Sequence, residues 1–368
     1  MSTRALIGTR KGLFTLDVDA GSFHLSPPAF AGARVANAVS DPRDGAWYAS
    51  LDHGHFGTHL HRSDDRGSSW VEIAAPEYPD KPDGVTHVNP MSQREVAWST
   101  QLAWIIEPGH TDEPGVLWCG TIPGGLFRSG DRGDSWEFVR ALWDLPARLK
   151  WMGGGYDDAG IHSIAIDPRG PGRVLVGISC GGAWKTSDGG ATWEVAAQGM
   201  RADFLPPELA GDPDTQDPHR IVRCPSAPDV LWTQHHCGIF RSIDDGDSWH
   251  EITDAGPSTF GFATAVHPSD PDTAWFAPGV SDEVRMPVDG RLVVTRTRDG
   301  GQTFDVLSNG LPDRAYDLIY RHAFDVDATG EQLLMGSTTG SLWWTGDGGD
   351  EWRQVSAHLP PIASIRFC

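Results

Sequence analysis

Residues 186–193 read Thr-Ser-Asp-Gly-Gly-Ala-Thr-Trp, and this stretch decides the fold because its pattern recurs along the chain. A hydroxyl residue is followed two positions later by Asp, two further on by Gly, and three beyond by Trp or Phe. Asp accepts backbone N–H groups within a tight turn, Gly takes a positive φ, and the aromatic ring packs back onto the strands. The pattern therefore predicts a structural turn that joins two β-strands.

Six complete copies of this turn are spread over the chain. Their aspartates, which we interpret as structural, are Asp65, Asp131, Asp188, Asp244, Asp299 and Asp347. Successive copies begin 48 to 66 residues apart when a degraded copy at Thr15, Asp17 and Phe23 is included. This period suits one four-stranded antiparallel blade with its loops.

The two ends of the chain complete one another. Strand-like residues 5–8 begin a blade that lacks its innermost strand, whereas residues 362–367 form a strand with no blade of its own. Pairing them leaves no free sheet edge at the seam. The sequence thus predicts a single all-β domain over residues 1–368, a seven-bladed β-propeller of four-stranded blades closed by the C-terminal strand.

These repeated turns resemble those of the BNR or Asp-box superfamily, which includes sialidases, two-domain xyloglucanases, sortilin-type receptors and photosystem assembly factors. The resemblance covers nearly the whole chain and implies the propeller fold, but such relatives share a turn and not a chemistry. The Arg-Ile-Pro signature of sialidases is absent, and sialidases have six blades, so exo-sialidase activity is not expected. No specific member of the superfamily is matched.

Charge and cysteine content restrict the function classes. A net charge of -21 disfavours binding to nucleic acid or to an anionic membrane surface. No apolar run is long enough to span a bilayer. The first residues lack the apolar stretch of a signal peptide, and the five cysteines are odd in number and scattered. We therefore expect a cytoplasmic location.

The long loops predict which face carries function. The Asp-box turns and the turns near Asp-Pro pairs share one face, because consecutive hairpin loops of an antiparallel blade alternate between faces. Residues 76–100, 142–160, 198–219 and 279–290 form long connections on the other face. Long ordered loops often carry binding or catalytic residues. We expect the site there, at the mouth of the central channel.

A group of histidines suggests a divalent metal. Alignment of the repeats places His162 and His219 at one equivalent position near the start of innermost strands, with His235 and His236 beside the same opening. The candidate metal ligands are His162, His219, His235 and His236, with a carboxylate from Asp157, Asp158 or Asp203. Imidazole nitrogens suit Zn, Mn, Fe or Ni. The alternative is that these imidazoles hydrogen-bond neighbouring strands around the channel.

A second group is basic and could bind an anion. The candidate ligand-binding residues are Arg10, Arg34, His53, His55, Arg285, Arg314 and Tyr316. Arginine recognises carboxylate and phosphate groups through its planar fork of donors. The alternative is a set of surface ion pairs, each contributing little.

Together these patterns favour an intracellular hydrolase or lyase, sialidase-like in fold and metal-dependent, that acts on a small polar or anionic metabolite. The alternative is a non-catalytic scaffold or assembly factor that presents its loop-rich face to a protein partner. No nucleic-acid or membrane partner is expected.

Overall fold

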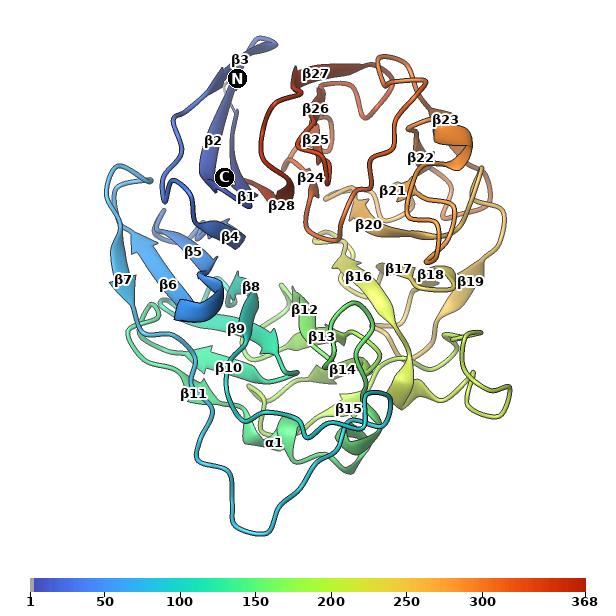
Figure 1. Ribbon diagram of the computed structural model, residues 1–368. Coiled ribbons are helices and arrows are strands. Elements are labelled where there is room, and N and C mark those ends of the chain that lie inside the picture. The colour runs from blue at the N-terminus through green and yellow to red at the C-terminus, as the bar shows by residue number, and fades with distance from the viewer. Residues whose placement is uncertain (1–2) are drawn as a thin grey trace.

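Seven four-stranded antiparallel sheets are arranged as blades in a ring, as Figure 1 shows for the computed structural model, which describes residues 3–368. The predicted seven-bladed propeller is confirmed. Each blade is numbered here from the N-terminus, and its strands are given from the axis outward. Within the described residues no helix is long and apolar enough to cross a membrane.

The first four blades follow one another around the ring. Blade 1 has β28 (Ile362–Phe367), β1 (Thr3–Thr9), β2 (Gly12–Asp19) and β3 (Ser22–Leu25). Blade 2 has β4 (Arg34–Ser40), β5 (Trp47–Asp52), β6 (Thr58–Ser63) and β7 (Val71–Ile73). Blade 3 has β8 (Leu102–Pro108), β9 (Leu117–Ile122), β10 (Leu126–Ser129) and β11 (Glu137–Phe138). Blade 4 has β12 (Ile161–Ile166), β13 (Val174–Ile178), β14 (Gly182–Thr186) and β15 (Glu194–Val195).

The remaining blades have the same layout. Blade 5 has β16 (Pro218–Arg223), β17 (Leu231–His235), β18 (Gly238–Ser242) and β19 (His250–Ile252). Blade 6 has β20 (Gly261–Val266), β21 (Ala274–Pro278), β22 (Val294–Thr297) and β23 (Asp305–Leu307). Blade 7 has β24 (Phe324–Val326), β25 (Leu333–Gly336), β26 (Leu342–Thr345) and β27 (Trp352–Ser356). Loops contain α1 (Arg140–Trp143) and the short 3₁₀ turns η1 (Gly54–Phe56), η2 (Pro146–Lys150), η3 (Pro213–Thr215) and η4 (Val288–Gly290).

The Asp boxes join the third and fourth strands of blades 2 to 7. In blade 5 the Asp244 carboxylate accepts hydrogen bonds from the Ser242 hydroxyl at 2.8 Å and from the Ser248 nitrogen at 2.9 Å. The Gly246 nitrogen donates to the Ser242 hydroxyl at 2.9 Å, and the φ of Gly246 is 82°. The box is therefore a self-contained turn, as predicted from its residues.

The degraded seventh copy is not a box. Thr15 and Asp17 lie inside β2, and the Asp17 carboxylate accepts hydrogen bonds from Arg4 of β1 at 2.5 and 2.8 Å. Positive φ at Ala20 and Gly21 forms a tight hairpin between β2 and β3 instead. The prediction of a box here was wrong because its carboxylate is paired across the sheet and cannot cap a turn.

The seam of the ring closes as predicted. Strand β28 pairs with β1, with Ile365 opposite Ile7 and Phe367 opposite Ala5. The side chains of Ile362 and Ile365 are buried in a cluster that also contains Phe324 of blade 7. The last strand thus joins blade 1 to blade 7 by hydrogen bonds and by apolar packing.

Tryptophans hold neighbouring blades together. Trp232 of β17 is fully buried, and its indole nitrogen donates to the Pro271 carbonyl of blade 6 at 3.0 Å. Trp275 of β21 is also fully buried and donates to the Gly348 carbonyl of blade 7 at 2.8 Å. Each indole therefore combines a large apolar contact with a satisfied polar atom.

A β-bulge near the start of the innermost strand positions the site. In blades 1 to 6 this strand carries extra residues that are unpaired with the second strand. The bulged residues include Ala36, Trp104, His162, His219, Phe262 and Ala363. A bulge turns the local side chain away from the regular alternation of the strand. The bulges lie around the axis of the ring, and the equivalent placing of His162 and His219 follows from them.

Candidate functional site

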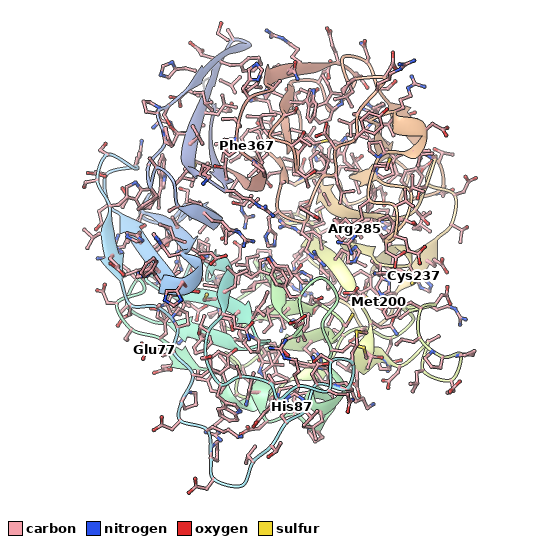
Figure 2. All side chains as sticks on the ribbon, in the orientation of Figure 1. Glu77, His87, Met200, Cys237, Arg285 and Phe367 are labelled. Atoms are coloured by element: carbon pink, nitrogen blue, oxygen red, sulfur yellow. The ribbon has the colours of Figure 1, made fainter. Side chains whose placement is uncertain are left out.

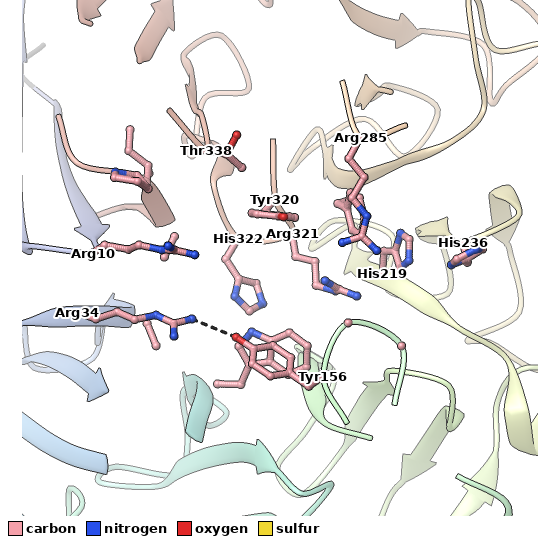
Figure 3. A pocket seen from close by; sticks show the side chains of 18 residues that line it. Arg10, Arg34, Tyr156, His219, His236, Arg285, Tyr320, Arg321, His322 and Thr338 are labelled. Atoms are coloured by element: carbon pink, nitrogen blue, oxygen red, sulfur yellow. Dashed lines mark hydrogen bonds between the residues drawn. The ribbon is translucent and has the colours of Figure 1, made fainter. Parts of the chain in front are cut away.

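A cavity of about 390 Å³ lies at the axis, on the face opposite the Asp boxes. Its lining includes the bulged Trp104, His219 and Phe262 of innermost strands. It also includes Arg10 and Thr338, from the loops that join the second and third strands, counted from the axis, of blades 1 and 7. Figure 3 shows these basic, aromatic and imidazole groups converging on one opening. The loop-rich face thus contains a built concave site.

Five residues singled out from the sequence line this cavity. They are Arg10, Arg34, His219, His236 and Arg285. Figure 2 shows Arg285 near the centre of the ring, with Glu77 and His87 further out.

Other sequence candidates lie outside the cavity lining. His53 precedes the exposed turn η1, where its ring contacts that of His59 with centroids 4.9 Å apart, and His55 belongs to the same turn. Arg314 is exposed, and the Tyr316 side chain beside it is 72% exposed.

The proposed acidic partners of the histidines are placed elsewhere in this structure. Asp157 pairs with Arg94 at 2.7 Å, and Asp203 pairs with Arg201 at 2.5 Å. Asp158 lies 3.3 Å from the Asn89 side-chain nitrogen. These loop carboxylates therefore have local partners of their own.

His162 and His235 have surroundings unlike those of His219 and His236. His162 is fully buried, with Nδ1 3.0 Å from the Ser163 hydroxyl and its ring against Trp104. Both ring nitrogens of His235 face backbone N–H groups, of Asp217 and of Cys237, each at 3.0 Å. The ring of His235 is therefore engaged by the backbone of its own hairpin.

Arg321 is the main site residue that the sequence reasoning missed. Its side chain lines the cavity although the residue is only 8% exposed, and its guanidinium lies 5.2 Å from the ring centroids of both Trp104 and Phe262. Among residues 3–368 it forms neither a hydrogen bond nor an ion pair. Burial lowers the pKa of Arg321 from its ordinary value. A buried cation held between aromatic faces and facing a cavity is available to an anionic ligand.

The sequence of blade 7, which follows Arg321, contains part of the Asp-Pro turn signal found in other blades. The backbone nitrogen of Asp327 bonds to the Gln332 carbonyl at 2.9 Å, as that of Asp167 bonds to Arg173 in blade 4 at 3.0 Å. Asp327 thus holds the position of the Asp-Pro landmark, but Ala328 follows it instead of proline. The Asp-Pro pair that marks this turn in other blades is therefore absent from blade 7.

The other arginines differ in how far they are neutralised. Arg34 pairs with Asp52 at 2.7 Å and donates to the Tyr156 hydroxyl at 3.0 Å. The Nε of Arg285 donates to the backbone carbonyl of Asp282 at 2.9 Å, and its guanidinium lies 5.4 Å from the Phe262 centroid. Neither Arg285 nor Arg10 has an ion-pair partner in the described chain. The cavity is therefore locally cationic inside an acidic protein.

Asp217, His219 and His236 form a compact cluster on one wall of the cavity. The Asp217 Oδ2 lies 3.2 Å from Nδ1 of His236 and 3.5 Å from Nε2 of His219. Its Oδ1 accepts a hydrogen bond from the Cys180 nitrogen at 3.0 Å. One ligand atom from each of the three residues lies within 4.8 Å of the others. Two imidazole nitrogens and a carboxylate oxygen form a donor set that suits a first-row divalent cation.

Burial and neighbouring groups shift the pKa of the Asp217 carboxyl in opposite directions. Burial disfavours the charged carboxylate, but the neighbouring imidazoles of His219 and His236 and the positive charge of Arg321 hold the pKa of Asp217 well below its usual range. Burial lowers the pKa of His219. The cluster therefore keeps a carboxylate beside a neutral imidazole.

These features define an Asp-box seven-bladed propeller with a cationic axial cavity. No family model matches the chain. A probable oligoxyloglucan-reducing end-specific xyloglucanase of Neosartorya fischeri is 29% identical over 158 residues, covering 42% of this chain and 16% of that protein. The chain thus matches about a sixth of the length of this relative.

Two solved structures show the same fold at low sequence identity. The Niastella koreensis GH74 enzyme superposes with a TM-score of 0.65 at 16% identity, covering 95% of this chain and 51% of the other. YCF48 from Cyanidioschyzon merolae superposes with a TM-score of 0.56 at 15% identity, covering 94% and 89%. Relatives of the xyloglucanase type and the shared propeller confirm the predicted resemblance to this superfamily.

Proposed function

We propose that the protein binds a small anionic molecule in the axial cavity and acts on it as a hydrolase or lyase. The observation that carries this proposal is Arg321, a buried guanidinium that faces the cavity and makes no direct ion pair within the described residues. Leaving a charge buried and unpaired costs several kcal/mol, and an anionic ligand would remove that cost. The expected ligand chemistry is a carboxylate or phosphate group.

The remaining lining fits such a ligand. Arg10 and Arg285 add positive charge at the mouth, and Tyr320 and Thr338 add hydroxyl groups. Phe262 and Trp104 provide apolar walls that exclude water and strengthen electrostatic contacts. A small molecule with more than one anionic group would use these features together.

A hydrolytic reaction is supported by similarity and by the cluster at the wall. The Neosartorya fischeri relative is named as a probable xyloglucanase, and the superposed Niastella koreensis structure is named as a GH74 enzyme. Asp217, His219 and His236 provide groups that can activate water next to a bound anion. The substrate would be smaller and more acidic than a neutral polysaccharide, because the site is a small cationic cavity.

Calorimetric titration tests the anion site with three probes: malonate, inorganic phosphate and the neutral malonamide. Wild-type protein, freed of metal with EDTA, should bind malonate or phosphate but not malonamide. Arg321→Met should weaken that binding at least tenfold, whereas Arg314→Met, which alters an exposed arginine outside the cavity, should leave it unchanged. Equal affinity in wild type and Arg321→Met would overturn the proposal.

The reaction class needs a separate assay. Release of 4-nitrophenol from an anionic 4-nitrophenyl glycuronide should exceed release from the neutral glucoside, and Arg321→Met should reduce only the former. If neither glycoside is cleaved, an acidic ester panel tests hydrolysis more broadly. Binding without any turnover would restrict the function to ligand binding.

A second candidate is a partner-binding scaffold, favoured by the long segment 76–100. This segment exposes Val85, Val88 and Met91, whose exposed fractions are 39%, 43% and 59%. Exposed apolar side chains grouped on one connection can form an interface core. Replacing all three by Ser should abolish capture of a protein partner while leaving malonate binding intact, and unchanged capture would exclude this surface.

A further inference from the structure

We propose that Asp217, His219 and His236 bind one divalent transition-metal ion at the wall of the axial cavity. The inference deepens the proposed function, on which it rests for the role of the metal, since the ion would sit where the anionic substrate binds. It does not depend on the identity of that substrate. The geometry that carries it is the orientation of the two imidazoles.

His219 presents a lone pair to the cluster. Its Nδ1 lies 2.6 Å from the Gly261 carbonyl oxygen, which can only accept a hydrogen bond, so the proton resides on Nδ1. In a neutral imidazole Nε2 then has no proton. That Nε2 faces the carboxylate of Asp217 at 3.5 Å, which places two lone pairs against each other in a buried site. Such an arrangement is unfavourable unless a cation lies between them.

The ring of His236 lies between two carboxylates, one of which is that of Asp217. Its Nε2 lies 3.3 Å from the carboxylate of Asp282, and its Nδ1 lies 3.2 Å from that of Asp217. Either carboxylate can accept the ring N–H; with an ion in the cluster, Nδ1 would give its lone pair to the ion and Nε2–H would donate to Asp282, whose side chain is half-exposed. Metal-binding histidines commonly donate the other ring N–H to a carbonyl or a carboxylate in this way. Gly261 and Asp282 therefore act as positioning groups for the two rings.

The three ligands come from one rigid hairpin. Asp217 directly precedes β16, His219 occupies the bulge of that strand, and His236 follows β17. The His236 nitrogen bonds to the Asp217 carbonyl at 3.0 Å, which fixes the two residues relative to each other. A site held by paired strands needs little reorganisation to take up an ion.

Three protein ligands leave part of the coordination sphere open. Asp217 and His219 are buried, whereas His236 is partly exposed and lines the cavity with Arg321. In the view of Figure 3 the Arg321 guanidinium lies near His219. Catalytic zinc sites likewise use three protein ligands and an open position. A substrate oxyanion could then contact both the ion and the Arg321 guanidinium.

Metal titration of the full-length protein tests the site. Untagged protein is stripped with EDTA and titrated with Co²⁺, Zn²⁺, Mn²⁺ or anaerobic Fe²⁺, with elemental analysis and the Co²⁺ visible spectrum as readouts. We expect one equivalent of at least one ion, with Co²⁺ d–d bands if cobalt binds. Asp217→Asn and His236→Gln should each weaken binding more than tenfold, and Asp282→Asn should weaken it 10- to 100-fold. His55→Gln, which alters an exposed imidazole outside the cavity, should leave it unchanged.

Several outcomes would overturn the metal site. They are less than a tenth of an equivalent bound to wild type for every ion, or equal affinities in wild type, Asp217→Asn and His236→Gln. Should Asp217→Asn not fold, His236→Gln decides, because His236 is partly exposed and its change removes little packing. The malonate titration of metal-free protein separates the two proposals. Retained malonate binding without metal binding defeats only the metal site, and the reverse defeats only the anion site.

Discussion

The Nε2 atom of His322 lies 2.7 Å from the backbone carbonyl oxygen of His162, 160 residues earlier in the chain. His322 precedes β24 of blade 7 and His162 lies on β12 of blade 4, so the bond links two non-adjacent blades across the axis. The carbonyl can only accept, and His322 must therefore carry a proton on Nε2. This contact ties opposite sides of the ring together beneath the cavity.

The buried histidines predict a steep loss of stability in mild acid. Burial lowers the pKa of His322 to about 3, and burial together with Arg148 lowers the pKa of His87 to about 4, both from 6.5. Because these folded-state pKa values are depressed, the unfolded chain binds more protons below pH 6.5. Stability is thus complete above pH 6.5 and falls as the pH decreases toward 4, by about 1.4 kcal/mol per pH unit for each histidine.

Urea unfolding between pH 4.5 and 7.5 measures this slope. His322→Gln keeps an N–H donor for the His162 carbonyl but cannot titrate, so its slope should be smaller than that of wild type by about 1.4 kcal/mol per pH unit. His55→Gln removes an exposed imidazole and should show the wild-type slope. Identical slopes for wild type and His322→Gln would contradict the assigned protonation.

The Asp boxes should contribute to stability one turn at a time. Asp244→Ala removes the acceptor for the Ser242 hydroxyl and for the nitrogen and hydroxyl of Ser248. We expect a loss of about 2 kcal/mol, because these bonds involve a charged acceptor. Asp244→Asn keeps one oxygen and should lose less. The measurement is chemical unfolding, with the exposed Asp254→Ala as control, and equal stability of Asp244→Ala and the control would argue against the turn as a stabilising unit.

Most of the fold could be predicted because its information is local. The box specifies a turn through residues close in sequence, and its repetition specifies the number of blades. Residues 362–367, predicted as the closing strand, coincide with β28, and residues 5–8 lie within β1. The ring closure could be predicted because the first blade lacks its innermost strand and the C-terminus has a strand without a blade. The prediction of an Asp box in the first blade was wrong, because Asp17 has the right spacing but pairs with Arg4.

The site was less predictable because it is assembled from distant segments. The sequence pointed to His219, His236 and three of the arginines, but it could not show the bulges that turn side chains toward the axis. Asp217 lies two residues before His219, but the sequence predicted a carboxylate from Asp157, Asp158 or Asp203 instead. Arg321 lies in the blade without the proline landmark. Contacts between blades, and not local pattern, decide which charged groups remain unpaired.

Close backbone contact between blades makes one glycine essential for packing. Gly199 has a φ of 90°, and a Cβ added there would collide with the backbone carbonyl oxygen of Trp249 in the adjoining box. Gly199→Ala should therefore destabilise the protein by at least about 2 kcal/mol, through both strain and the clash. Gly211→Ala is the matched control, because a Cβ there meets no atom within 4 Å. Thermal unfolding should separate the two variants, and similar midpoints would show that the blades can move apart at this contact.

The seam predicts that the last strand is required to keep the protein from aggregating. Removing residues 362–368 would expose the edge of β1 and the side chains that pack on Ile362 and Ile365, and an unpaired edge promotes association. Size-exclusion chromatography should show aggregates in place of the discrete peak of the wild-type protein.

A milder change at the seam gives a quantitative measure. Ile365→Ala should cost about 2 to 4 kcal/mol in chemical unfolding, since the side chain is 3% exposed and opposes Ile7. Val306→Ala, at a residue 49% exposed on an outer strand, should change stability by less than about 0.5 kcal/mol. If both substitutions cost the same small amount, the ring does not depend on its closing strand, because the other six blades would then hold blade 1 without help from β28.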